Sequence, residues 1–462
     1  MRQFGESMHF NGMSLFLAQI PQGTQLYRGT SLPHPVTHLQ WLAFEPEHAL
    51  AVVHALSKPG VKQYLHTYHT MRPLQMVYID GQSAAKTTKG VFDVQDLIIR
   101  DPTKAPKPPP PGSLPPGALG DSERAEEMCH LAETTWKGKI DGFIRMQGGF
   151  EVILCSAVRK LRVITIKALS TQAKVDELNY YKAVAARFDG IGDHRVSLDF
   201  DRMVSMYAYG DLVYIDKQGF PRVNNRTTWL SMAKTDLTKM TTSFHFSSGH
   251  DWQSIMDMYV SRYSDKIQNF ASGHVKDFNR MLEIVDATLE AFIDYSRRDT
   301  KRETKDCAEQ FWPVDLTSIF VCPTRLSVAA QASRLVAYRI CTTFLTVEKM
   351  KDPRKAISAF RKLKKWLDWA TFKRCRGCAV DAMCVAPIWP LGTKQDYEQP
   401  ECRKSLEGLV GGKDSFWTEP TDTSRPLGLP ASASACLSSL LQNIHDNLSD
   451  TSRLTIDPRP QQ

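Results

Sequence analysis

The chain places a cation and a carboxylate at positions where each could act on a ligand. Arg28 stands near the end of a strand-like run, Gln25–Thr30 (QLYRGT), and Gly29 beside it would let a ligand approach the backbone closely. Glu151 follows a Gly-Gly turn and opens an apolar strand-like run that ends at Cys155. Charged groups at the ends of strands can hold or polarise a substrate, so these two residues are the first candidates for a site.

Two further segments lie between these residues in the chain. Trp41 belongs to a strand-like run that turns at Pro46 into a helical stretch. Residues 64–80 read as two strands broken at Pro73. The order is therefore a strand with a cation, a strand that leads into a helix, a strand pair, and a strand that opens with a carboxylate.

This ordered series resembles the ADP-ribosyltransferase superfamily over about residues 24–160. Its members tend to read LY-R/H-G-T, then a strand and a helix, then a strand pair, and finally a Glu that opens a late strand. The resemblance implies an NAD-dependent glycosyltransferase. It places Arg28 and Gly29 where NAD is held, and Trp41 where a ring could stack on nicotinamide. It makes Glu151 the catalytic carboxylate that stabilises an oxocarbenium-like transition state as nicotinamide leaves.

The sequence departs from that superfamily at two places. The middle motif, which normally holds Ser-Thr-Ser or a Tyr, reads WLAF from Trp41 to Phe44. Members that modify arginine usually carry a second Glu two positions before the catalytic one, where this chain has Gly149. Arginine is therefore not the expected acceptor. Two alternatives stay open: an inactive copy of the fold, and a protein in which Arg28 and Glu151 are ordinary strand-end residues.

A second resemblance covers other segments. Residues 366–392 and 78–87 are similar to blocks of filamentous-fungal proteins of undefined function, some of which are secreted or belong to secondary metabolism. This implies an alternative function, an enzyme or accessory protein of a fungal secondary-metabolite pathway, such as a tRNA-dependent or other group transferase, without NAD chemistry. The run from Gly81 to Thr87 lacks the second glycine of a phosphate loop, so we expect a polar loop, which would border an NAD pocket.

Four cysteines gather late in the chain: Cys375, Cys378, Cys384 and Cys402. The CxxC spacing of the first two suits a tetrahedral zinc, but the other two are far apart in the sequence. Three states stay open: buried thiols or one local disulfide, two disulfides, or a zinc site. We expect no metal.

Residues 353–372 combine an apolar helix face with many Lys and Arg on the other side. Such a helix could contact nucleic-acid phosphate or an anionic membrane. A packed helix with a solvated basic face gives the same pattern. Nucleic acid is therefore a candidate partner beside NAD or another small-molecule substrate.

The elements that would position these residues fall into two groups, which together predict an α+β fold. We expect a strand-rich ADP-ribosyltransferase-like domain over residues 1–165, with a Pro-rich insertion at 101–121. A largely helical domain follows over residues 166–410, and residues 411–462 read as a mostly disordered tail. Strands are expected at 25–27, 40–43, 64–70, 74–79, 151–155 and within 195–214, and helices at 172–188, 251–264, 276–295, 327–349 and 353–372.

Composition bounds the class of protein. The 462 residues are 42% hydrophobic and 23% charged, which excludes a wholly disordered chain and a disulfide-dense miniprotein. The formal net charge of +8 is a mild basic bias that favours anionic partners. No apolar stretch is long enough to cross a bilayer, and we read no signal peptide, so a cytoplasmic protein without a membrane span is expected. The sequence leaves the oligomeric state open.

Overall fold

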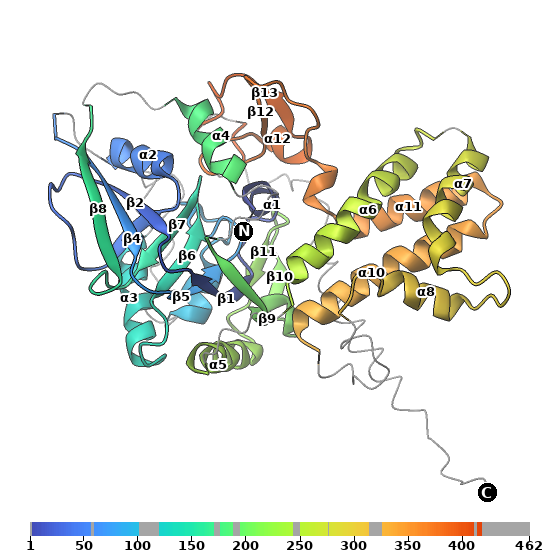
Figure 1. The fold of residues 1–462 in the computed structure, drawn as a ribbon, viewed down its shortest axis with the longest axis horizontal. Coiled ribbons are helices and arrows are strands. Elements are labelled where there is room, and N and C mark those ends of the chain that lie inside the picture. The colour runs from blue at the N-terminus through green and yellow to red at the C-terminus, as the bar shows by residue number, and fades with distance from the viewer. Residues whose placement is uncertain are drawn as a thin grey trace, which may run out of the picture. The chain divides into compact units, whose positions relative to one another are not determined.

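The computed structural model describes residues 2–56, 60–100, 120–170, 176–187, 195–243, 250–275, 277–313, 326–410 and 414–417. The chain divides into two compact units. The sheet unit comprises Met1–Met206, Asp211–Gly249 and Ala370–Leu427, and the helical unit comprises Tyr207–Gly210, His250–Trp369 and Gly428–Gln462. The predicted α+β class is confirmed (Figure 1).

A nine-stranded sheet forms the centre of the sheet unit, with the strand order β8-β4-β2-β3-β7-β6-β5-β1-β9. All neighbouring strands are antiparallel except β5 and β6, which are parallel. The strands are β1 (Ser14–Ile20), β2 (Gln25–Thr30), β3 (Gln40–Ala43), β4 (Tyr64–Thr70), β5 (Leu74–Ile79), β6 (Gly142–Met146), β7 (Phe150–Leu154), β8 (Leu161–Ala168) and β9 (Ser197–Ser205).

The central strands are buried on both faces, which explains their nearly continuous apolar sequences. One face belongs to a core that includes Tyr78, Ile144 and Val152, against which Val184 and Ile388 pack from later in the chain. On the other face Phe143 lies beside Trp136, with ring centroids 5.9 Å apart. The edge strand β8 is largely exposed by contrast.

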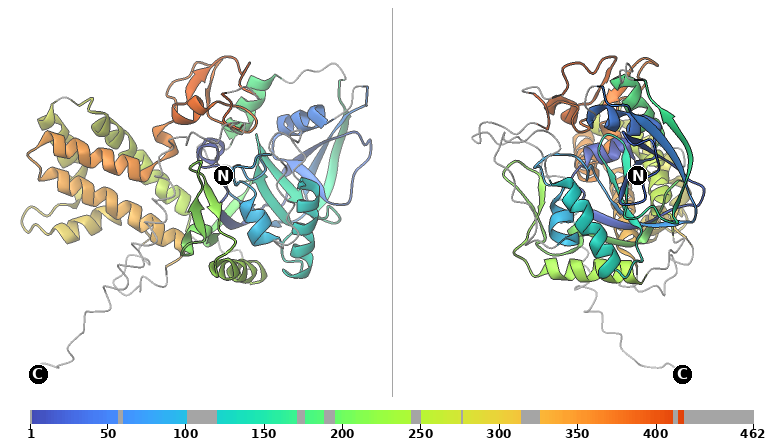
Figure 2. Two further views of the ribbon diagram at one scale, coloured as in Figure 1. Left: turned by 180° about the vertical axis from the view of Figure 1, so that it is seen from behind. Right: turned by 90° about the vertical axis from the view of Figure 1, so that its left-hand side faces the viewer.

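Short helices surround this sheet. α5 contacts β9 and η1, and α2 contacts β2, β3 and α4 (Figure 2). The helices of the sheet unit are α1 (Gln3–Met8), α2 (Pro46–Leu56), η1 (Gln95–Ile99), α3 (Asp121–Thr134), α4 (Glu177–Arg187), α5 (Trp229–Thr242), η6 (Ala370–Phe372) and α12 (Lys394–Glu398). Two small two-stranded sheets pair β10 (Val213–Ile215) with β11 (Pro221–Val223) and β12 (Met383–Val385) with β13 (Glu401–Arg403). The turn η3 (Met206–Ala208) lies at the boundary of the units.

The helical unit is a bundle in which each α-helix of the described residues begins at a side-chain cap. The five caps are Asp251, Asp277, Asp299, Ser327 and Asp352, each of which accepts a backbone N–H of the first turn. Aromatic rings fill the interior, where Phe270, Phe344 and Phe360 contact one another. The helices are α6 (Trp252–Ser272), α7 (Phe278–Leu289), α8 (Thr300–Ala308), α10 (Val328–Glu348) and α11 (Pro353–Leu367), with the short turn η4 (Glu290–Phe292).

The unit boundaries differ from the predicted domains. β8 and β9 extend the sheet past residue 165, and residues 370–417 pack on the sheet unit although they follow the helices in sequence. Apart from Gly120 and Asp121, the predicted Pro-rich insertion lies outside the described residues. The same holds for the tail from residue 411, except residues 414–417. No helix of the described residues is both long and apolar enough to cross a membrane.

Candidate active site on the nine-stranded sheet

The three strands that carry the predicted site residues are consecutive in the sheet. β3 lies between β2 and β7, and Ala43 pairs with Tyr27 on one side and with Glu151 on the other. Arg145 of β6 continues this row as the partner of Glu151. Segments separated by more than a hundred residues of sequence are thereby neighbours (Figure 1).

The sheet opens between β2 and β3. β3 pairs with β7 through all four of its residues, whereas β2 and β3 pair only at Tyr27 and Ala43. An uninterrupted antiparallel ladder would next pair Arg28 with Leu42, and this pair is not formed. The strands therefore diverge at the position of the predicted cation.

Arg28 carries a buried donor that is not used. Its Nη1 has no hydrogen-bond partner among the described residues. Burial lowers the pKa of Arg28, while the nearby Tyr68 raises it. His66, the cross-strand partner of Arg28, is fully buried, with Nδ1 2.9 Å from the Tyr68 hydroxyl and Nε2 2.8 Å from the Leu32 carbonyl oxygen. A half-buried guanidinium with a buried, unused N–H fits an anionic oxygen of a ligand.

Gly29 has a different role from the one expected. A Cβ at this position would lie 2.3 Å from the Ala49 carbonyl oxygen and 2.5 Å from Val53 Cβ. The glycine is required because helix α2 crosses β2 at this distance, so the close approach is to a helix rather than to a ligand.

Trp41 is half-buried and pairs with Ile153, two residues after Glu151. It therefore lies on the same sheet face as Glu151.

Glu151 is bound by an arginine that the sequence did not indicate. Its Oε1 accepts hydrogen bonds from Arg145 Nε at 3.0 Å and Nη2 at 2.5 Å. Arg145 is fully buried and also donates to Asp121 at 3.0 Å and to the Gln95 side-chain oxygen at 3.0 Å. Oε2 of Glu151 accepts no hydrogen bond from the described residues. One carboxylate oxygen is thus fixed and the other is available to a reacting group.

A buried ionic network extends from this pair. Lys86 contacts Asp121 at 2.5 Å, and the Arg124 guanidinium contacts Asp96 at 2.8 Å. Burial would raise the pKa of Asp121, but Arg145 and Lys86 outweigh it and hold the pKa far below its usual range. Burial lowers the pKa of Lys86. Lys86 belongs to the predicted polar loop of residues 81–87, which therefore reaches the surroundings of Glu151 through this lysine.

A histidine and a tyrosine complete the surroundings of Glu151. His48 Nδ1 lies 2.7 Å from the Tyr180 hydroxyl, and the two rings are stacked. Burial lowers the pKa of His48 although Glu151 raises it, so His48 is neutral near pH 7. A Cβ on Gly149 would lie 3.0 Å from His48 Cγ. The imidazole therefore stands where a second glutamate would have to fit.

The structure does not bring Arg28 and Glu151 into one cluster. Tyr27 shares a row with Glu151, and side chains alternate along a strand, so Arg28 projects to the opposite sheet face. Sequence reasoning missed four residues that surround Glu151, His48, Asp121, Arg145 and Tyr180, whereas Lys86 belongs to the loop that was expected to border the pocket. A sequence signal for Arg145 did exist, because this charged residue interrupts an otherwise apolar strand-like run, residues 142–146.

The clustered cysteines form two disulfides, Cys375–Cys384 and Cys378–Cys402. The sulfur atoms of three of them, Cys375, Cys378 and Cys402, lie within 4.8 Å of one another. Two more disulfides join Cys129 to Cys155 and Cys307 to Cys341. Eight of the ten cysteines are therefore paired, and the two-disulfide alternative describes the late cluster.

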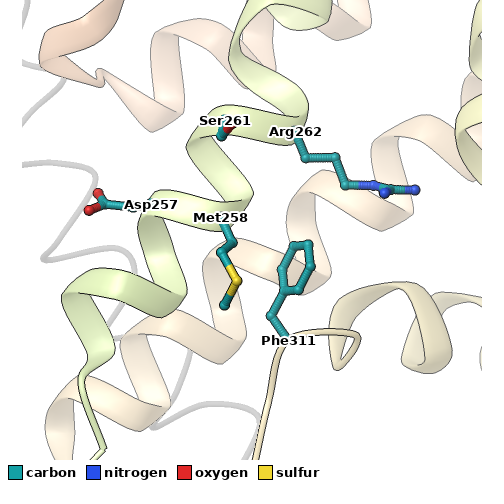
Figure 3. A pocket seen from close by; sticks show the side chains of 5 residues that line it. All are labelled: Asp257, Met258, Ser261, Arg262 and Phe311. Carbon is teal, nitrogen blue, oxygen red and sulfur yellow. The ribbon is translucent and has the colours of Figure 1, made fainter. Parts of the chain in front are cut away.

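The helical unit has a pocket of its own, of about 410 Å³. Met258 and Phe311 form its apolar part, and the Arg262 side chain extends at its other end (Figure 3). Asp257 and Ser261 complete the lining. None of the predicted site residues lines this pocket.

Part of the region around Glu151 is similar to a family of known proteins. Residues 55–186 match the model of the YPL277C N-terminal domain family. Uncharacterized protein YOR389W of Saccharomyces cerevisiae is 29% identical over 196 residues, which are 34% of this chain and 29% of that protein. Uncharacterized protein YPL277C of the same yeast is 29% identical over 197 residues, 34% of this chain and 38% of that protein.

The chain thus spans about a third of the length of the curated relatives it matches. No solved structure matches. The region matched by the family model contains Lys86, Asp121, Arg145 and Glu151, but neither Arg28 nor Trp41. The chain is therefore similar to this family in the part that forms the ionic network.

Proposed function

We propose that the sheet unit is an ADP-ribosyltransferase-like domain that binds NAD and uses Glu151 in cleaving it. The observation that carries the proposal is the adjacency of β2, β3 and β7, with Ala43 between Tyr27 and Glu151. The divergence of β2 from β3 beside Arg28 supports it, because Arg28 carries a buried Nη1 donor that has no hydrogen-bond partner among the described residues. The acceptor of ADP-ribose is not specified by these contacts.

Each residue has a defined part in the proposed reaction. Arg28 donates to an anionic oxygen of NAD on one sheet face, and Trp41 packs on the nicotinamide ring on the other face, so NAD has to pass through the opening between β2 and β3. The bond between C1′ of the ribose and the nicotinamide nitrogen breaks, and nicotinamide leaves with the bonding pair. Glu151 Oε2 stabilises the positive charge on the sugar, while Arg145 keeps Oε1 in place. An acceptor lone pair then bonds to C1′, and its proton passes to solvent.

A binding experiment tests the first part of this proposal. We expect millimolar NAD to raise the melting temperature, since a ligand at 100 times its dissociation constant stabilises by about 2.7 kcal/mol. Arg28→Gln should remove the shift, because the anion loses its donor. Arg162→Gln, at an exposed position on the edge strand β8, is the matched control and should keep it. An equal shift in wild type and Arg28→Gln would contradict the assignment of Arg28.

We also propose that the protein works in an oxidising compartment. Four disulfides lie among the described residues, three within the sheet unit and one within the helical unit. Such bonds persist mainly in secreted proteins and in the secretory pathway. The expected cytoplasmic location is not supported by this observation. Thiol titration of unfolded, unreduced protein should find no more than two of the ten cysteines free, and eight or more free thiols would contradict the proposal.

A further inference from the structure

One side of helix α11 presents a continuous row of cations to solvent. Arg354, Lys355, Arg361, Lys362 and Lys365 are all exposed, and we call these five residues the basic stripe. The spacing explains the row. Arg354, Arg361 and Lys365 are seven and four residues apart and lie along one line of the helix, with Lys355 and Lys362 along the next. The stripe is about 16 Å long at 1.5 Å per residue.

The opposite side of the helix is fully used in packing. Ala356, Phe360, Leu363 and Leu367 are buried, and Phe360 contacts Phe270 and Phe344 in the bundle core. The helix therefore has no apolar face left for insertion into a lipid bilayer. The exposed side of the helix can therefore bind a partner through its charged side chains.

The cations of the stripe have no carboxylate partner among the described residues. Asp352, the closest acidic residue in the sequence, accepts the backbone N–H groups of Arg354 and Lys355 as the helix cap. Arg361 uses Nε to donate to the Ala271 carbonyl at 2.9 Å. Five neighbouring like charges without counterions repel one another, and an anionic partner would relieve this repulsion.

The surroundings favour one kind of polyanion. Nucleic-acid single strands are held by stacking of bases on exposed aromatic rings as well as by charge. The aromatic residue at the edge of the stripe, Trp366, is already covered by Arg339, whose guanidinium carbon lies 4.4 Å from the ring centroid. The choice of an acidic polysaccharide rests on the oxidising compartment proposed above, since such polysaccharides are common polyanions outside cells.

We propose that the basic stripe of α11 is a binding surface for a linear anionic polysaccharide. The contact is made by side-chain cations to sulfate or carboxylate groups along the sugar chain. It is independent of Arg28 and Glu151 and of NAD.

Heparin binding by the full chain tests this proposal. The variant Arg354→Gln, Lys355→Gln, Lys362→Gln, Lys365→Gln removes four exposed cations and keeps Arg361, which bonds the bundle. We expect its Kd for heparin at 0.1 M salt to rise at least about tenfold. The slope of log affinity against log salt should fall by about three, since each lost contact releases roughly 0.7 to 0.9 fewer counterions.

A matched variant separates position from net charge. Lys137→Gln, Lys139→Gln, Arg162→Gln, Lys167→Gln removes four exposed cations of the sheet unit and should bind heparin like wild type. Equal weakening in both variants would overturn the proposal, as would no heparin binding by wild type. Tighter binding of poly(U) or of vesicles with anionic lipid than of heparin, lost in the stripe variant, would assign the stripe to another partner and also overturn it.

Discussion

Two arginines on strands of the same sheet have opposite surroundings. Arg145 is fully buried, and its guanidinium donates to Glu151, Asp121 and Gln95. Arg28 projects to the other face at a point where two strands diverge, and its buried Nη1 has no partner among the described residues. A buried charge with a full set of partners belongs to the fold, whereas one with an unused donor is suited to a ligand.

We therefore expect Arg145 to serve stability and propose that Arg28 serves ligand binding. The ion pairs of Arg145 fix one oxygen of Glu151, so the residue positions the candidate carboxylate. Arg28 contributes little to folding, because few contacts offset the free-energy cost of burying part of its charge. The two residues should therefore respond to substitution in opposite ways.

Replacing Arg145 should have the largest effect on stability. Arg145→Met leaves Asp121 and Glu151 without their main counterion in a buried place, and removing one partner of a buried pair costs about 3–5 kcal/mol. Urea unfolding followed by circular dichroism would measure this loss. A change of less than about 1 kcal/mol would show that the network is not structural.

The disulfide beside the network should have the next effect. Cys129 lies on α3, the helix that begins with Asp121, and Cys155 directly follows β7. The bond thus ties Asp121 to the strand of Glu151. Replacing both cysteines by serine should cost about 3 kcal/mol for a loop of this length. Replacing Cys307 and Cys341 of the helical unit by serine is the control. It should leave unchanged the pH dependence of stability that comes from Asp121.

Low pH should weaken the ion pairs that Arg145 and Lys86 form with Asp121 and so lower the stability of the protein. The pKa of Asp121 is held far below its usual range in the fold, so its ionised form stabilises the protein above the unfolded pKa of about 3.9. This contribution is lost as the pH falls from there toward the folded pKa. The difference in unfolding free energy between wild type and Asp121→Asn should therefore be full at pH 7 and shrink below about pH 4. A constant difference from pH 7 to pH 3 would contradict the ionic role.

The smallest effect is expected at Arg28. Arg28→Met removes a half-buried cation with an unused donor, so stability should change by no more than about 0.5 kcal/mol or should increase. The melting temperature without ligand measures this. A loss as large as that of Arg145→Met would remove the distinction between the two arginines.

The sequence predicted individual elements better than their arrangement. The expected strands at 40–43, 64–70 and 74–79 are the observed β3, β4 and β5, because each is a β-branched or aromatic run between turn residues. The α10 and α11 helices begin at or next to their expected starts, where Ser327 and Asp352 act as caps. The charged helix α8 was not expected, because Cys307 and Ala308 are the only apolar residues in its sequence.

The candidate site was predictable only in part. Glu151 and Arg28 stand at positions with a sequence signature, but their opposite faces follow from the pairing of β2 and β3 at a single residue pair. The partners of Glu151 come from distant parts of the sequence, with Asp121 and His48 on separate helices. Contacts of this kind depend on strand order, which no local pattern specifies.

Release of nicotinamide from NAD tests the central claim most directly. Wild type should release nicotinamide, and Glu151→Gln should lose at least about a hundredfold in rate while remaining folded by circular dichroism. Glu303→Gln is the matched control, because Glu303 is a buried carboxylate paired with Arg298 in the helical unit. The account predicts loss in the first variant and wild-type release in the second. Equal release by wild type and Glu151→Gln, or none from wild type at millimolar NAD, would contradict it.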